Sequence, residues 1–251
     1  MHWPERIGRL SMDLFDIATD TKYSTDAKAV TDFAGRSVHS QSQHWCTPPQ
    51  YVTAVKRVFG GEIELDPCSN SESIVRAKHE FKLPDTNGLE QEWNYGSIYV
   101  NPPYGADRAR GTTIRNWLAK CACSRETYGA QVIALVPVAT NTLHWKKYVF
   151  GSADAVCFLY DTRLRFLVNG STDNKGAPMA CAMIYWGDDY QGFEAVFSEF
   201  GAVLSLAALK DNERQKRTRE MTLFDFAGDS KFNGGNKVRS LSRRPELTCA
   251  I

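Results

Sequence analysis

Three short runs with strand-like sequences in the middle of the chain each meet a proline beside polar residues, and this pattern constrains the fold most. The runs are residues 62–65 before Asp66-Pro67, residues 97–100 before Asn101-Pro102-Pro103, and residues 131–138, which include Pro137. Such runs are typical of buried strands. Because proline cannot donate a ladder hydrogen bond, we expect the first two strands to end where the prolines begin.

Segments with helical spacing alternate with these strands. Residues 50–59 have apolar side chains at helical intervals, prolines at the start and Gly60-Gly61 at the end, which predicts a helix. The sequence also predicts helices over 113–123 and 141–150, and strands over 155–160, 164–168 and 179–186. This alternation indicates an α/β fold with a twisted, mostly parallel sheet and helices on both faces. Ligands of such sheets bind outside the carboxyl ends of the strands, so the polar-plus-proline ends should line one site.

Charge divides the 251-residue chain into three parts. Residues 41–209 contain 15 basic and 17 acidic side chains and are expected to form the folded domain. Residues 1–40 read as a flexible N-terminal segment of net charge −1, and residues 210–251 as a basic, disordered tail of net charge +4. A basic tail often contacts nucleic acid, but it can equally be a solvated end.

Several functional classes are not expected. The seven cysteines form no C-x-x-C pair and the five histidines have no ligand spacing, so we predict no metal site. No apolar run reaches the ~18 residues of a spanning helix, and the first ten residues lack the apolar core of a secretory signal. These features favour a cytoplasmic protein without a membrane partner.

Asn101-Pro102-Pro103-Tyr104 carries the clearest chemical signal. The prolines fix a stiff turn, and the Asn101 amide oxygen and the Pro102 carbonyl offer two acceptors aimed at one point. Two acceptors match the two hydrogens of an exocyclic amine, and binding both exposes the nitrogen lone pair for attack on a methyl electrophile. Tyr104 offers a flat face for base stacking, worth ~1–3 kcal/mol per base. The alternative is a purely structural turn with a packed tyrosine.

This tetrapeptide stands in a series of short motifs. In chain order they are Trp45-Cys46-Thr47-Pro48 (W-x-T-P), Leu65-Asp66-Pro67 (L-D-P), Gly88 to Trp93 (G-L-x-x-x-W), Arg163 to Phe166 (R-x-R-F) and Ala177-Pro178 (A-P). Together they resemble the phage-type DNA N6-adenine methyltransferase family, which uses S-adenosylmethionine. The resemblance covers about residues 44–190 and neither terminal segment.

The resemblance implies a Rossmann-like S-adenosylmethionine-dependent methyltransferase fold and a set of site residues. Asn101, Pro102, Pro103 and Tyr104 would hold a flipped adenine. Thr47 and Pro48 would hold the methionine end of the cofactor, and Asp66, Pro67, Cys68 and Ser69 would form the turn beneath it. Trp45, which precedes them, is also implied as a cofactor-binding residue. Cys68-Ser69-Asn70 replaces the G-x-G that often follows D-P in methyltransferases.

The acidic residue for the cofactor ribose is less defined by the sequence. Asp85 lies 19 residues after Asp66, close to the ~20 typical of a ribose-binding acid in such folds. Glu80 and Glu90 are the alternatives.

Candidate contacts to double-stranded DNA follow the same motifs. Arg108 and Arg110 lie in a loop after Tyr104, where they could bind a phosphate. Arg163, Arg165 and Lys175 flank an expected hairpin, and Phe166 is a candidate to pack against the flipped base or enter the base stack. For each of these side chains, a solvated surface charge or a core position is the alternative.

The two terminal segments share the pattern M-x-L-F-D. Met12-Asp13-Leu14-Phe15 and Met221-Thr222-Leu223-Phe224 resemble the short peptides with which bacterial replication and repair proteins bind the sliding clamp. Neither copy has the leading glutamine of those peptides, and two amphipathic turns packed on the domain are the alternative.

The sequence therefore predicts a DNA adenine N6-methyltransferase. Enzymes that methylate RNA bases or glutamine side chains also use an N-P-P-Y turn, so these acceptors stay open. A non-catalytic module that binds DNA or the clamp is a third possibility, and it predicts no cofactor binding.

Overall fold

The computed structural model describes residues 45–218, except 108–109, 161–163, 169–170, 173–176, 178, 213–214 and 217. Both M-x-L-F-D segments and most of the basic tail lie outside these residues. So do Arg108, Arg163, Lys175 and Pro178, about which the structure says nothing.

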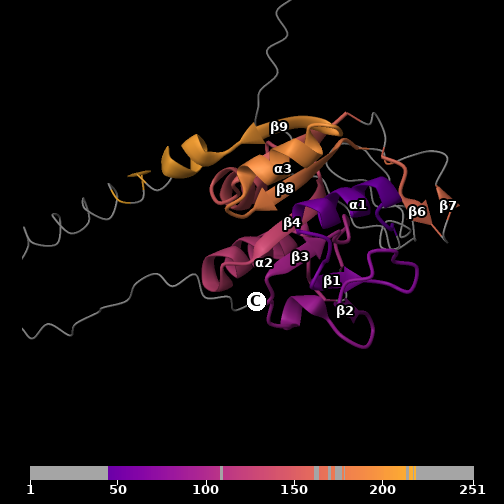
Figure 1. Cartoon of the computed structure of the whole chain (residues 1–251). Helices are drawn as coiled ribbons and strands as arrows, with labels where there is room; N and C mark the ends of the chain where they lie inside the picture. The colour runs from indigo at the N-terminus through magenta and orange to yellow at the C-terminus, as the bar shows by residue number, and fades with distance from the viewer. Residues whose placement is uncertain are drawn as a thin grey trace, which may run out of the picture. The chain divides into compact units, whose positions relative to one another are not determined.

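The described residues contain a seven-stranded sheet in the order β2-β1-β3-β4-β8-β5-β9 (Figure 1). The pairs β2-β1, β1-β3 and β3-β4 are parallel, and β8 and β9 run antiparallel to their neighbours, so five of the seven strands share one direction. The strands are β1 (Leu65–Ser69), β2 (His79–Lys82), β3 (Ser97–Val100), β4 (Gln131–Pro137), β5 (Ala155–Leu159), β8 (Cys181–Trp186) and β9 (Gly201–Ser205). A separate two-stranded ribbon pairs β6 (Leu167–Val168) with β7 (Ser171–Thr172).

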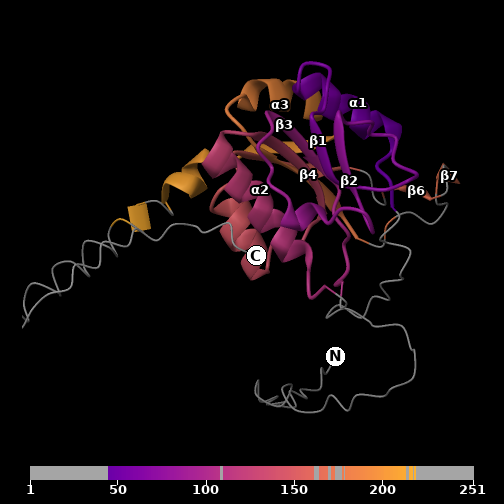
Figure 2. The same cartoon turned by 90° about the horizontal axis from the view of Figure 1, so that it is seen from below.

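Helices cover both faces of the sheet (Figure 2). On one face lie α1 (Pro49–Val58) and α3 (Tyr190–Phe197). On the other lie α2 (Ile114–Tyr128), the 3₁₀ turn η2 (Gly88–Glu90) and the π-helical segment η3 (Trp145–Phe150). This arrangement confirms the expected α/β class with helices on both faces, and it is compatible with a Rossmann-like methyltransferase fold.

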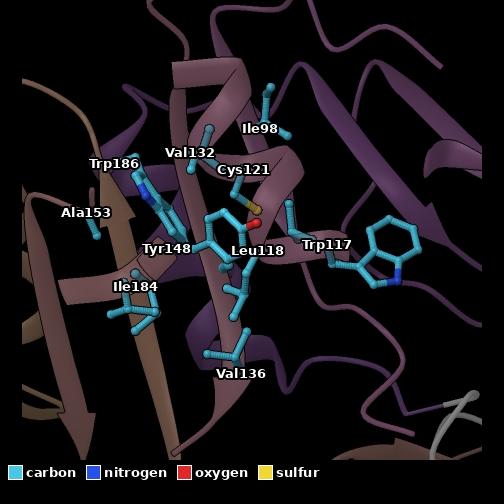
Figure 3. Close-up of a cluster of buried hydrophobic side chains, with 14 of the residues drawn as sticks. Ile98, Trp117, Leu118, Cys121, Val132, Val136, Tyr148, Ala153, Ile184 and Trp186 are labelled. Atoms are coloured by element: carbon cyan, nitrogen blue, oxygen red, sulfur yellow. The ribbon is translucent and has the colours of Figure 1, made fainter. Parts of the chain in front are cut away.

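Strand residues alternate between the two cores, as the two-residue period of a strand requires. In β8, Ala182, Ile184 and Trp186 pack with α2 and η3, whereas the residues between them pack with α1 and α3. Figure 3 shows the first of these cores, in which Trp117, Leu118 and Cys121 of α2 meet side chains of the sheet. Because both faces are covered, the central strands contain few polar residues, which explains why the sequence signal there is strong.

The structure differs from the sequence prediction in several elements. The strand expected over 62–65 shares only Leu65 with β1, which begins there and runs through Asp66 and Pro67. Its register with β2 shifts between Asp66 and Ser69 and so accommodates a residue without an N–H. The strand expected over 164–168 is reduced to the two residues of β6 and lies outside the main sheet. β2, α3 and β9 were not predicted.

The carboxyl ends of β1, β3 and β4 lie next to one another, as expected. The chain passes from β1 to β2 on one side and then returns to β3 on the other side of β1. The ends of β1 and β3 therefore flank the point where the strand order reverses, which is where ligands bind in such sheets.

Candidate active site

Asn101 directly follows β3, and its side chain has a fixed orientation. Its Nδ2 donates a 2.8 Å hydrogen bond to the backbone carbonyl of Trp45. The amide oxygen is thereby turned away from Trp45, and no described residue donates a hydrogen bond to it. Asn101 is therefore a positioned acceptor with one open oxygen.

The segment Trp45 to Pro48 is held in place on two sides. Cys46 forms a two-bond antiparallel bridge with Leu167. The Thr47 hydroxyl lies 2.6 Å from the hydroxyl of Tyr99 in β3, and both side chains are buried. Pro48 is the N-cap of α1, whose first residue is Pro49. These contacts fix the carbonyl of Trp45, and through it the amide of Asn101.

A pocket lies between the ends of β1 and β3, and we call it the Thr47 pocket. It is lined by Trp45, Cys46, Thr47, Asp66, Cys68, Ser69, Asn70, Ser73, Val75, Asn101 and Pro103. The hydroxyl of Ser69 is the only buried side-chain nitrogen or oxygen among the described residues that has no hydrogen-bond partner. A buried hydroxyl without a partner is costly, and its place in this pocket points to a polar ligand.

Asp66 is buried in the Thr47 pocket, and its carboxylate accepts a 3.1 Å hydrogen bond from the backbone N–H of Cys68. Its pKa is raised to about 7: burial is the main cause, the hydrogen bond from Cys68 opposes it, and the nearby Glu80 on β2 adds to the rise. Glu80 itself pairs with Lys82 at 2.6 Å.

A second and larger pocket, which we call the Gly88 pocket, adjoins the first. It shares Cys68, Ser69 and Pro103 with the Thr47 pocket. Its other lining residues are Pro67, Phe81, Leu83, Thr86, Asn87, Gly88, Leu89, Gly105, Asp107, Arg110, Thr112 and Trp117. The two pockets together follow the carboxyl ends of β2, β1 and β3.

Gly88 explains the G-L-x-x-x-W stretch. A Cβ at this position would lie 1.8 Å from the carbonyl oxygen of Pro67, so only glycine lets η2 pack against β1. The indole of Trp93 donates a 2.8 Å hydrogen bond to the Gly88 carbonyl. The stretch is thus a structural wall of the pocket.

Three aromatic rings gather beside Asn101. Trp45 and Phe166 stack with their centroids 4.9 Å apart, and Tyr104 meets both rings edge-on at 6.0 and 5.6 Å. The Tyr104 hydroxyl donates a 3.2 Å hydrogen bond to the carbonyl of Leu135 in β4. The Tyr104 ring is therefore fixed in place, and Phe166, which is 1% exposed, supports it from inside the domain.

Residues 35–218, about three quarters of the chain, match the model of the family described as DNA N-6-adenine-methyltransferase (Dam). The chain belongs to this family. No individual curated protein matches this chain.

The geometry brings most of the predicted site residues of this methyltransferase together. Trp45, Thr47, Asp66, Cys68, Ser69, Asn101 and Pro103 line one pocket, and Pro67 lines the adjoining one. Asp85 is exposed and lines neither pocket. Sequence reasoning missed the Gly88 pocket wall, in particular Phe81, Leu83, Thr86 and Asn87, because a short edge strand and the loop after it give no periodic signal.

Two of the predicted DNA-contacting cations are described. Arg110 forms a 2.6 Å ion pair with Asp107 and lines the Gly88 pocket. Arg165 is exposed beside the buried Phe166.

Within the described residues, none of the helices has the length and apolarity that crossing a membrane requires.

Proposed function

We propose that this methyltransferase transfers a methyl group from S-adenosylmethionine to the N6 amine of an adenine extruded from duplex DNA. The observation that supports the proposal most is the fixed Asn101 amide, whose open oxygen borders a pocket that also contains an unpartnered buried hydroxyl. The family match supplies the class of acceptor.

The residues present fit the cofactor. Thr47, Asp66 and Ser69 would face its polar methionine end, and the apolar walls Phe81, Leu89 and Trp117 of the Gly88 pocket would enclose its nucleoside. When bound, the cofactor supplies an electrophilic methyl group on a sulfonium, so the hard chemistry belongs to it. Asp85 remains a candidate for the ribose only if the loop that carries it turns toward the pocket.

The chain's own residues align and hold the base. The oxygen of Asn101 and the carbonyl of Pro102 would accept the two amine hydrogens, which directs the nitrogen lone pair toward the neighbouring pocket. The fixed ring of Tyr104 would stack on the base and offset part of the few kcal/mol that extrusion costs.

The deciding experiment follows the transfer of a labelled methyl group from S-adenosylmethionine to duplex DNA, RNA and protein. We expect label in duplex DNA, at N6 of adenine. Label in RNA or in glutamine would favour the alternative acceptors. Failure to bind the cofactor in calorimetry would favour a non-catalytic module.

Two further parts of the proposal concern where the enzyme works and with what. We propose that it acts on DNA in the cytoplasm of a bacterial or phage-infected cell. Clamp binding through the two M-x-L-F-D segments remains a prediction, because both lie outside the described residues. A pull-down with clamp protein that is unchanged when Leu14, Phe15, Leu223 and Phe224 become Ala would refute it.

A further inference from the structure

Charge along the catalytic domain is strongly segregated. Residues 108–153 contain seven Lys or Arg and a single acidic residue, Glu126, whereas the rest of residues 41–209 contain 8 basic and 16 acidic side chains. The net charge of −2 for the whole domain therefore conceals a stretch of +6. A basic stretch within an acidic domain is the expected footprint of a polyanion.

The stretch contains two helices that begin at the same edge of the sheet as Asn101. Helix α2 follows the loop after β3, and η3 follows β4, which is the parallel neighbour of β3. Arg115 lies in the first turn of α2, and Lys146 and Lys147 lie at the start of η3. All three are exposed, while Trp117, Leu118 and Tyr148 of the same helices point into the core (Figure 3).

These three cations have no ion-pair partner among the described residues, whereas Arg110 and Arg125 of the same stretch each have one. Arg110 pairs with Asp107, and Arg125 pairs with Asp188. Within the described residues, Arg115, Lys146 and Lys147 form no ion pair, and the Nζ of Lys147 lies 5.0 Å from the ring centroid of Tyr148. Their charge is therefore not neutralised within the described part of the molecule.

An exposed leucine, Leu143, lies three residues before Lys146. Leu143 is 67% exposed and lies in the helical turn that leads into η3. Two hydrogen bonds of Thr142 fix this turn. Its Oγ1 donates to the carbonyl of Ala139 at 2.6 Å, and its backbone carbonyl accepts from the N–H of Lys146 at 3.1 Å. Leu143 is thus presented to solvent by a rigid turn.

We propose that Arg115, Lys146 and Lys147 bind the phosphates of duplex DNA and that Leu143 enters the space that the extruded adenine leaves in the stack. The inference rests on the proposed function and adds to it the surface that receives the duplex. Its chemistry matches the ligand: cations neutralise phosphates, and an apolar wedge between base steps is a known way to compensate for unstacking. Because β3 and β4 are parallel neighbours, the segments that lead to α2 and η3 leave the sheet at the same edge as Asn101.

The first test measures binding of a fluorescent duplex by anisotropy over a range of salt concentrations, without cofactor. Each phosphate contact contributes about 0.9 to the slope of log K against log salt. The triple variant Arg115→Gln, Lys146→Gln, Lys147→Gln should reduce this slope by about 2 to 3 and weaken binding at low salt at least tenfold. A matched control, Lys56→Gln, Arg57→Gln, Lys78→Gln, removes equal charge from α1 and the approach to β2 and should bind like wild type.

The second test concerns Leu143. Leu143→Ala should lower methyl transfer to fully paired DNA roughly tenfold or more, and should have a smaller effect where the adenines are mispaired and already extruded at low cost. Leu204→Ala, which removes a leucine that is 51% exposed on β9, is the control. An equal effect of Leu143→Ala on both substrates, or none, contradicts the wedge role.

The tests separate this inference from the proposed function. If wild type methylates no DNA, the proposed function fails whatever the binding data show. If wild type methylates DNA but the triple variant, with an unchanged circular dichroism spectrum and Tm, keeps the wild-type affinity and salt slope, then the phosphate-binding surface is elsewhere and the inference is wrong.

Discussion

The backbone carbonyl of Trp45 and the side-chain amide of Asn101 are joined by a 2.8 Å hydrogen bond across 56 residues of sequence. The bond links the W-x-T-P segment before α1 to the turn after β3. The same segment is bound to β3 through Thr47 and Tyr99 and to β6 through Cys46 and Leu167. The proposed acceptor is therefore oriented by a part of the chain that also lines the Thr47 pocket.

Replacing Asn101 should abolish most activity without unfolding the protein. Asn101→Ala removes one of the two acceptors proposed for the amine, and removal of one preorganised group of this kind costs about 100- to 1000-fold in kcat. Asn101→Asp keeps an oxygen but places a carboxylate opposite the Trp45 carbonyl, so we expect a similar loss. Labelled methyl transfer measures the effect, and Asn94→Ala, at an exposed asparagine, is the control. Turnover like that of wild type in Asn101→Ala would contradict the assigned role.

Ser69→Ala should separate stability from cofactor binding. Its hydroxyl is buried without a partner, so its removal should raise the free energy of unfolding of the cofactor-free protein by about 1 kcal/mol. The same change should weaken S-adenosylmethionine binding roughly fivefold, because the bound cofactor would lose one hydrogen bond. Thermal unfolding and calorimetry test the two effects. The control is Ser124→Ala, at a buried serine on α2, which should leave cofactor affinity unchanged. If Ser69→Ala binds the cofactor as tightly as wild type, Ser69 does not contact the ligand.

Gly88→Ala should destabilise the domain because its Cβ would collide with the backbone of Pro67. Backbone shifts that relieve such overpacking cost about 1–3 kcal/mol or more, and here they would also distort the wall of the Gly88 pocket. Denaturant unfolding measures the loss. The control is Gly96→Ala, whose Cβ would meet only the flexible Glu64 carboxylate at 3.3 Å. A Gly88→Ala protein as stable as the control would refute the close approach.

Asp66 should make stability depend on pH. Burial is the main reason that its pKa in the folded protein is raised to about 7, above the ordinary value of 3.8. Between these values the folded state retains a proton that the unfolded state has lost, so the free energy of unfolding should fall as pH rises from about 4 to 7 and then level off. Asp66→Asn should remove this component. The free energy of unfolding of the variant minus that of wild type should therefore increase as pH rises over that range. A pH-independent difference would contradict the raised pKa.

The sequence predicts the parts of this fold that are buried on both faces. β3 and β4 are close to their expected bounds because β-branched runs covered by helices leave an unambiguous pattern. The meeting of Asp66, Ser69 and Asn101 followed from the rule that parallel strands place their carboxyl ends at one edge. The proline turn after β3 could be identified from four residues because proline restricts the backbone so strongly.

Other features depend on tertiary contacts and leave no local signal. His79 to Lys82 form an edge strand that is half exposed and rich in charge, so neither alternation nor hydrophobicity identifies it. The sequence makes Phe166 a candidate to contact the flipped base or the base stack, with a core position as the alternative. It is 1% exposed and stacks on Trp45, which lies more than 100 residues away in the sequence. The unpartnered hydroxyl of Ser69 can be recognised only once its surroundings are known.

The direction of β9 has a practical consequence. Because β9 is antiparallel to β5, Ser205 lies opposite Ala155, and Leu206 donates its N–H to the carbonyl of Asp154. The polypeptide thus leaves the sheet at the edge remote from Asn101. A programmable DNA-targeting module grafted after this exit would carry the enzyme to a chosen locus and leave unobstructed the edge that is proposed to bind the base.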